Sequence, residues 1–126
     1  MKEFRNRELT EKIIGCAMRV HSALGNGFQE VIYQRALEME TYDNGIKFGR
    51  EISIPVHYKQ HQIGERRVDF LVENIICVEL KALVNLEKVH MAQAKIYLEA
   101  FNLEVGLLLN FGSVSLEFRR IENLKV

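Results

Sequence analysis

The sequence predicts a single α+β domain, residues 1–126, in which helices flank a mixed central sheet. Three observations lead to this fold class. Apolar residues first follow helical spacing, then alternate with polar residues in the middle of the chain. Helical spacing returns after residue 86. A near-continuous apolar run at residues 75–81 is typical of a central strand buried on both faces. The expected order of elements is α-α-β-β-β-α-β-β.

Two helices are expected at the start of the chain. The first runs from about Thr10 to Leu24, with Thr10 as its cap, and the sequence Gly-Asn-Gly at residues 25–27 ends it. The second runs from about Phe28 to Asp43, with Asn26 as its cap. Asn-Gly at residues 44–45 then stops the helical pattern.

Three strands are expected in the middle of the chain. Alternation over residues 52–56 predicts a half-buried strand near a sheet edge, because Pro55 cannot donate a hydrogen bond to a neighbour. A turn at residues 59–62 leads to a second strand, Arg66–Val72. A second turn leads to the buried run, Ile75–Lys81.

The last third of the chain is expected to form one helix and two strands. Leu86–Phe101 has helical spacing, and Val105–Asn110 and Val114–Ile121 read as closing strands on either side of a turn at residues 111–113.

Composition limits the classes of function. Seventeen basic and seventeen acidic residues cancel, so contact with nucleic acid must come from a local patch or from bound metal ions. Cys16 and Cys77 are too few for a disulfide framework and are expected to be reduced thiols. No apolar run approaches the ~20 residues of a membrane span. The basic N-terminus lacks the apolar segment of a secretion signal. We therefore expect a cytoplasmic protein without membrane contact.

Three charged residues stand out in the predicted sheet. On a strand, Glu79 and Lys81 share one face while the apolar residues between and beside them share the other. Burying such charges costs several kcal/mol unless partners are present. Asp69 on the neighbouring strand can approach Glu79, and two carboxylates beside a lysine suit Mg²⁺ or Mn²⁺. An ordinary cross-strand ion network would use the same residues, so both interpretations stand at this point.

The chemistry that suits this triplet is phosphodiester hydrolysis. Asp69 and Glu79 would bind metal, and Lys81 would orient water or stabilise the developing charge.

Strand parity turns this hypothesis into a geometric prediction. If Asp69 opposes Glu79 in an antiparallel pair, then Val72 meets Ile76 and the hairpin has a three-residue loop, residues 73–75. A two-residue turn would put the carboxylates on opposite faces unless a β-bulge restored the parity.

Two further patterns lie near this triplet in the expected order. His90, Gln93 and Tyr97 fall on one face of the predicted third helix, as they would in any amphipathic helix. Glu30 and Tyr33 begin the second helix, where a glutamate also complements the helix dipole.

Together these motifs resemble a known family. Gly27-x-x-Glu30-x-x-Tyr33 resembles the GxxExxY signature. Asp69 followed by Glu79-x-Lys81 is similar to the core of the PD-(D/E)XK nuclease superfamily, although Val68 stands where many members have proline. The likeness runs from about residue 8 to residue 121.

One more motif points to a branch of that superfamily. Gln93-x-x-x-Tyr97 is similar to the QxxxY motif of the branch that includes the nuclease domains of bacterial recombination helicases and lambda exonuclease.

The resemblance implies a restriction-endonuclease-like core and a metal-dependent nuclease, with DNA as the favoured partner. It implies that Glu30 joins Asp69 and Glu79 as a metal ligand, and that the catalytic set is completed by Lys81. The implied substrate-binding residues are Gln93, Tyr97, His90 and Tyr33.

A different class of function remains open. A catalytically silent module with the same fold could bind nucleic acid or protein, for example as a homodimer. Small size and zero net charge favour this alternative, whereas the complete set of motif residues favours the nuclease.

Overall fold

The computed structural model describes residues 2–125, with side chains from residue 6 onward, and confirms the predicted order of elements. Within that range the chain forms three helices and five strands. Their bounds are α1 (Lys2–Leu24), α2 (Glu30–Asp43), β1 (Phe48–Tyr58), β2 (His61–Val72), β3 (Ile76–Lys81), α3 (Lys88–Phe101), β4 (Val105–Asn110) and β5 (Glu117–Glu122).

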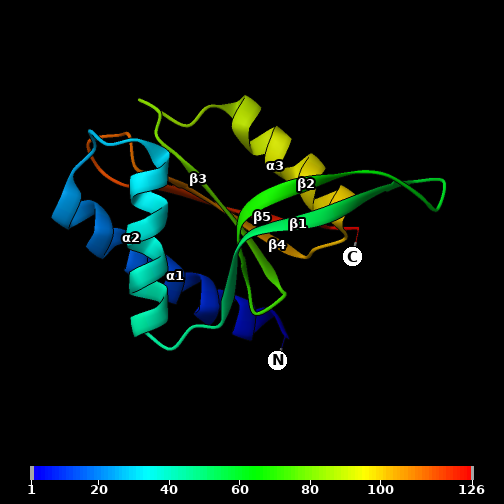
Figure 1. Ribbon diagram of the computed structural model, residues 1–126, viewed down its shortest axis with the longest axis horizontal. Helices are drawn as coiled ribbons and strands as arrows, with labels where there is room; N and C mark the ends of the chain where they lie inside the picture. Colours follow the sequence, from blue (N-terminus) through cyan, green and yellow to red (C-terminus); the bar gives the residue numbers. More distant parts are fainter. Residues whose placement is uncertain (1, 126) are drawn as a thin grey trace.

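The five strands form one mixed sheet in the spatial order β1-β2-β3-β4-β5 (Figure 1). Strands β3 and β4 are parallel and are joined by α3, whereas the other neighbouring pairs are antiparallel. Because β1 lies at one edge, Pro55 occupies an edge strand as predicted. The central position of β3 explains its continuous apolar run.

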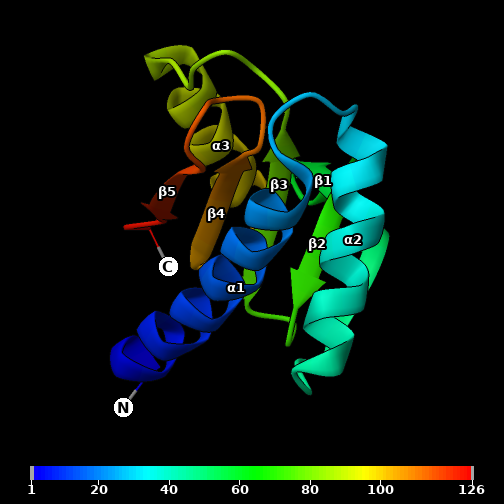
Figure 2. The same ribbon diagram turned by 90° about the vertical axis from the view of Figure 1, so that its left-hand side faces the viewer.

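Helices cover both faces of the sheet (Figure 2). α1 and α2 lie on one face and α3 lies on the other. Each face has its own apolar core. The α1/α2 core includes Ile13, Tyr33, Leu37, Val78, Leu80 and Leu107. The α3 core is smaller and contains Ile54, Val68, Cys77, Leu98 and Phe101.

Strand β3 divides its side chains between these two cores. Ile76, Val78 and Leu80 are buried in the α1/α2 core. Cys77 packs in the α3 core, and Glu79 and Lys81 follow it on the same face at the period of two. The predicted separation of the charged pair from the apolar residues is confirmed.

Both cysteines are buried and free, as expected. Burial raises the pKa of the Cys77 thiol to about 12, so this thiol stays protonated near neutral pH.

Helix boundaries differ from the sequence predictions in two places. α1 begins eight residues before Thr10, because the Thr10 hydroxyl donates to the Arg7 carbonyl inside the helix instead of capping it. α2 begins at Glu30 with Gln29 as its N-cap, and the Asn26 amide instead donates to the Gly112 carbonyl. Both predicted caps are therefore wrong.

The β1–β2 hairpin is longer than predicted. It turns at Lys59 and Gln60, both with positive φ (48° and 68°), and projects away from α1 and α2 (Figure 1).

The final strand, β5, is shorter than predicted and starts at Glu117. Residues 111–116 form a loop instead of the start of the strand, and in this loop the Ser113 hydroxyl donates to the Ser115 carbonyl. Among the described helices, none is long and apolar enough to cross a bilayer.

Candidate active site

The hairpin between β2 and β3 sets the register of the candidate site. Val72 pairs with Ile76, which leaves a three-residue loop, and Glu73 and Asn74 adopt positive φ of 50° and 58°. The predicted three-residue loop and the pair of Val72 with Ile76 are confirmed, whereas Asp69 and Glu79 do not form a pair of the ladder. A one-residue slip would have reversed every side chain of β3 relative to β2.

Asp69 lies just beyond the last pair of this ladder, Phe70 with Val78. Its Oδ2 accepts a hydrogen bond from the Leu80 backbone N–H at 2.7 Å. Its Oδ1 accepts a bond from the Gln34 side-chain Nε2 at 3.1 Å. The carboxylate is therefore held against the carboxyl end of β3, just beyond the last β2–β3 pair.

Strand β2 changes face at Asp69. Phe70 packs in the α1/α2 core, whereas Val68, two residues earlier, packs in the α3 core. The facing residue of β1, Glu51, has a φ of 53° and is skipped in the β1–β2 register. As a result Arg66, which precedes this irregularity, lies on the α3 side of the sheet together with Glu79.

Glu79 is half-buried beneath α3 and forms an ion pair with Arg66, with 2.5 Å between Oε1 and Nη1. The Arg66 guanidinium also lies over the Tyr97 ring, 3.9 Å from its centre. Burial raises the pKa of Glu79, although Arg66 opposes this effect strongly. The charge of Asp69 raises that pKa further, and Lys81 lowers it.

Glu30 lies in the same electrostatic neighbourhood from the start of α2. Partial loss of hydration raises its pKa first, and the charge of Asp69 adds to the rise, whereas Lys81 opposes it. Like-charge repulsion therefore contributes to the pKa shifts of Glu30 and Glu79, but burial is the larger cause in both cases.

The residues predicted on α3 face the same site. His90, Gln93 and Tyr97 line a narrow pocket with Lys81 and Glu79. Its free volume is about 10 Å³, which is room for about one water molecule. The His90 imidazole also accepts a bond from the Glu87 N–H, so it caps α3 as well as lining the pocket.

Tyr33 has no exposed surface, which corrects the expectation that it contacts substrate directly. Its hydroxyl donates to the Gly25 carbonyl at 2.6 Å and accepts from the Phe28 N–H at 3.1 Å. Its ring stacks on Phe111 at 4.7 Å. Tyr33 therefore fixes the loop that leads into Glu30.

The carboxylates have the donor chemistry of a site for a hard cation, but they are not assembled as one. Among residues 6–125, whose side chains the structure describes, no three His, Cys, Asp or Glu side chains are arranged to hold a metal ion. Glu79 is paired with Arg66, and Asp69 is bonded to Gln34 and to the backbone of β3. A metal ion that used Oε1 of Glu79 would have to displace the guanidinium of Arg66.

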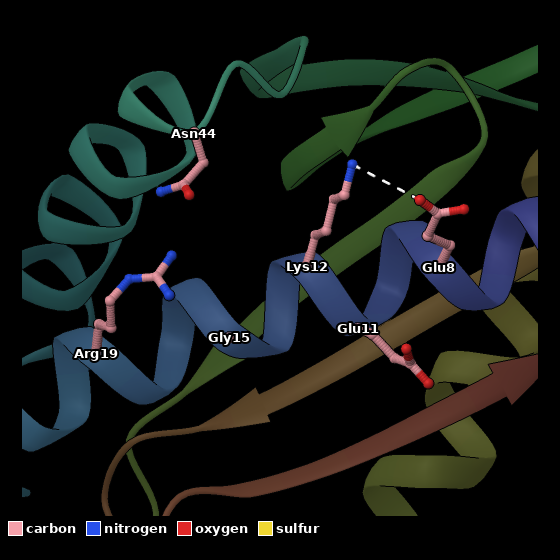
Figure 3. Close-up of a pocket in the computed structure, with 6 residues that line it drawn as sticks. All are labelled: Glu8, Glu11, Lys12, Gly15, Arg19 and Asn44. Carbon is pink, nitrogen blue, oxygen red and sulfur yellow. Dashed lines mark ion pairs between the residues drawn. The ribbon is translucent and has the colours of Figure 1, made fainter.

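A second hollow, of about 380 Å³, lies along α1 away from this site (Figure 3). Its two basic side chains are already paired with carboxylates of the same chain. Lys12 pairs with Glu8 at 3.9 Å, and Arg19 pairs with Glu40 at 3.1 Å. This hollow offers no uncompensated charge to a ligand from those two basic residues.

The sequence profile described as the PD-(D/E)XK nuclease superfamily matches residues 7–121. The chain belongs to this superfamily. Membership supports a nuclease-type function and agrees with the mixed five-stranded sheet between helices. The match covers all the motif residues of the candidate site.

The fold of this PD-(D/E)XK protein is also similar to the crystal structure of SSO0001, with a TM-score of 0.57 and 20% sequence identity. The alignment covers 75% of this chain but only 50% of that one, so the chain spans about half the length of SSO0001. At this identity the likeness shows the fold alone. Comparison with curated proteins finds no match.

Sequence reasoning did not connect Gln34 or Arg66 with the carboxylates of this PD-(D/E)XK site, to which both side chains bond. Gln34 lies one helical turn after Glu30, so the i, i+4 spacing could have pointed to it. Arg66 lies an odd number of residues before Asp69, and regular alternation would have placed the two on opposite faces. Only the irregularity of β2 reveals the role of Arg66.

Proposed function

We propose that this chain is a metal-dependent nuclease that hydrolyses phosphodiester bonds, with DNA as its preferred substrate and Mg²⁺ or Mn²⁺ as its cofactor. The observation that supports the proposal is the bond from the Leu80 N–H to Asp69, because Leu80 stands between Glu79 and Lys81 at the carboxyl end of β3. Superfamily membership supports the same class of reaction.

Three carboxylates would hold the metal: Asp69, Glu79 and Glu30. Carboxylate oxygens are the ligands that Mg²⁺ and Mn²⁺ prefer. When bound, such an ion supplies Lewis-acid charge and lowers the pKa of water.

Protein side chains would stabilise the developing charge and bind the phosphate. Lys81 is half-buried beside Glu79, where its ammonium can stabilise negative charge that develops on the phosphate oxygens. Gln93 is exposed at the pocket rim and can donate to a phosphate, and His90 and Tyr97 complete that wall. Tyr33 would act indirectly, by fixing the loop before Glu30.

Cleavage of single- and double-stranded DNA and RNA in Mn²⁺ tests this function. Lys81→Ala should lower turnover by about a hundredfold or more, because it removes charge stabilisation needed mainly in the transition state. Glu79→Ala should instead weaken Mn²⁺ binding in calorimetry. Lys95→Ala, on the exposed surface of α3, is the matched control and should leave both properties unchanged.

Lys81→Ala with unchanged cleavage kinetics would refute the assignment. Cleavage of RNA but not DNA would keep the reaction and change the substrate.

The second candidate function is a silent nuclease-fold module that binds nucleic acid or protein, with a homodimer as one form. The tight pocket and the Arg66–Glu79 pair favour it, because they leave little room for substrate in this state. Failure to bind Mg²⁺ or Mn²⁺ would favour the module.

Two finer assignments belong to the same proposal. The Gly27-x-x-Glu30-x-x-Tyr33 motif supports membership of the GxxExxY group, and the buried free thiols of Cys16 and Cys77 support a cytoplasmic location.

A further inference from the structure

Arg66 occupies the space between the two walls of the candidate site. On one side it pairs with Glu79 from β3, and on the other it stacks on Tyr97 from α3. The Arg66 side chain is 31% exposed and that of Glu79 is 13% exposed, so the pair is withdrawn from bulk water. An ion pair in such surroundings is stronger than one on the open surface.

This arrangement puts two cations in competition for one carboxylate. Glu79 is bonded to the Arg66 guanidinium, whereas the proposed function assigns Glu79 to a metal ion. A metal ion that binds Oε1 has to displace the guanidinium, and one that binds the other oxygen of Glu79 is repelled by the positive charge beside it, so Arg66 lowers the affinity in either case. The narrow pocket agrees with this state, since the guanidinium lines its wall.

We propose that Arg66 is an internal latch that competes with the divalent metal for Glu79 and, once displaced, binds a phosphate of the substrate backbone. This inference rests on the proposed function. The metal-free protein keeps Glu79 neutralised by Arg66, and metal binding exchanges that partner.

The displaced guanidinium has a chemically suitable second ligand. Arginine binds phosphate with two parallel N–H donors, a geometry that lysine lacks. Tyr97 can keep the guanidinium plane at the pocket through the stacking contact while its Glu79 bond is broken. The same residue therefore restrains metal binding and contributes to substrate binding, so that substrate affinity depends on the metal.

Calorimetry with Mn²⁺ tests the competition. Arg66→Gln should bind Mn²⁺ about fivefold to tenfold more tightly than the parent protein, because the competing cation is gone. Arg67→Gln is the matched control: it removes the same charge from the next residue of β2, whose side chain is 66% exposed and pairs with Glu51. The control should change the affinity by less than about twofold.

A second variant keeps the test possible if the first one does not fold. If Arg66→Gln unfolds, Arg66→Lys keeps a cation but loses the forked, stacking geometry, and it should bind Mn²⁺ more tightly than the parent by a smaller factor. Unchanged or weaker Mn²⁺ binding in a folded Arg66 variant would overturn the latch.

DNA binding tests the exchange. On a Lys81→Ala background, which leaves the substrate intact, Mn²⁺ should strengthen binding of labelled DNA. Adding Arg66→Gln should remove most of that gain, although this variant binds the metal better. A gain that persists without Arg66 would overturn its role as a phosphate ligand.

The outcomes separate this inference from the proposed function. If the parent protein binds Mn²⁺ and Arg66→Gln binds it equally, the latch fails and the nuclease proposal survives. If neither protein binds Mn²⁺, both fail. If only Arg66→Gln binds, the latch is supported in its strongest form.

Discussion

The position of Asp69 depends on a chain of polar contacts that starts outside the motifs. Gln34 is 7% exposed, donates to Asp69 and accepts from the Arg50 Nε at 2.7 Å. Because Arg50 can only donate and the carboxylate can only accept, these two neighbours fix which way the amide points. Gln34 is therefore a positioning residue for Asp69.

Replacing Gln34 tests this role at the scale of one residue. Gln34→Ala should lower turnover about tenfold to a hundredfold, as loss of an outer partner of a metal ligand does, and should weaken Mn²⁺ binding in calorimetry. Gln62→Ala, on the exposed β1–β2 hairpin, is the control. A folded Gln34→Ala protein with unchanged metal affinity would show that Asp69 does not need this contact.

At the scale of elements, the β3–α3 connection is fixed by Asn110 at the end of β4. The buried Asn110 amide accepts from Leu83 N–H and donates to the Leu83 carbonyl, and it also bonds to Gly112 and Glu117. These bonds join the segment after Lys81 to the loop after β4. They set where α3, and with it the pocket wall, begins.

Gly112 allows this approach of two loops. A Cβ at this position would lie 2.4 Å from the Leu83 backbone nitrogen and 2.5 Å from the Ala82 carbonyl carbon, both rigid backbone atoms. Gly112→Ala should therefore lower the free energy of unfolding by about 1–3 kcal/mol in urea denaturation. Gly64→Ala, which meets nothing within 4 Å, should change it by less than about 1 kcal/mol. Equal effects would show that the loops can separate freely.

Glu117 connects β5 to the same junction and makes it sensitive to pH. Hydrogen bonds from the Asn110 amide and the Leu86 N–H lower the pKa of Glu117 in the folded chain. A lowered pKa adds stability above the unfolded value, about 4.3, and this stability is lost as pH falls through the folded value.

Comparing Glu117→Gln with the parent measures this contribution. The parent should be more stable at pH 7, and the difference should shrink as the pH falls below the unfolded pKa and through the lowered pKa of folded Glu117. Glu65→Gln, an exposed substitution on β2, should show no such trend. A stability difference that is independent of pH would contradict the role of the charge.

At the scale of the whole molecule, sequence patterns predict the order of helices and strands and the faces of β3 better than they predict helix caps and contacts between distant segments. The apolar run of β3 has one physical explanation, burial on both faces, and its parity correctly separates Glu79 and Lys81 from Val78 and Leu80. The same parity argument predicts the three-residue loop between β2 and β3, which the pairing of Val72 with Ile76 confirms.

The errors have a common physical origin in contacts between distant segments. Asn26 looks like a helix cap, but its amide bonds instead to the Gly112 carbonyl, 86 residues away. Tyr33 looks like a site residue because the motif contains it, yet Phe111 buries it. Arg66 reaches Glu79 only because β2 changes face. Local spacing carries no information about such tertiary contacts.

Metal binding should stabilise the whole domain, since its proposed ligands come from three different elements: Glu30 from α2, Asp69 from β2 and Glu79 from β3. An ion that binds the folded state but not the unfolded chain stabilises by mass action, by about 2.7 kcal/mol at a hundredfold excess over its Kd. Thermal unfolding with increasing Mg²⁺ or Mn²⁺ should therefore show a steadily rising Tm.

The size of that rise should depend on the carboxylates. Glu79→Ala should abolish most of it, and Glu122→Ala, an exposed glutamate on β5, should preserve it. Because Arg66 competes for Glu79 in the metal-free state, Arg66→Gln should start from a lower Tm and gain more on adding metal. A Tm that is indifferent to millimolar Mg²⁺ and Mn²⁺ in every one of these proteins would refute the metal site and leave the silent module as the function of this fold.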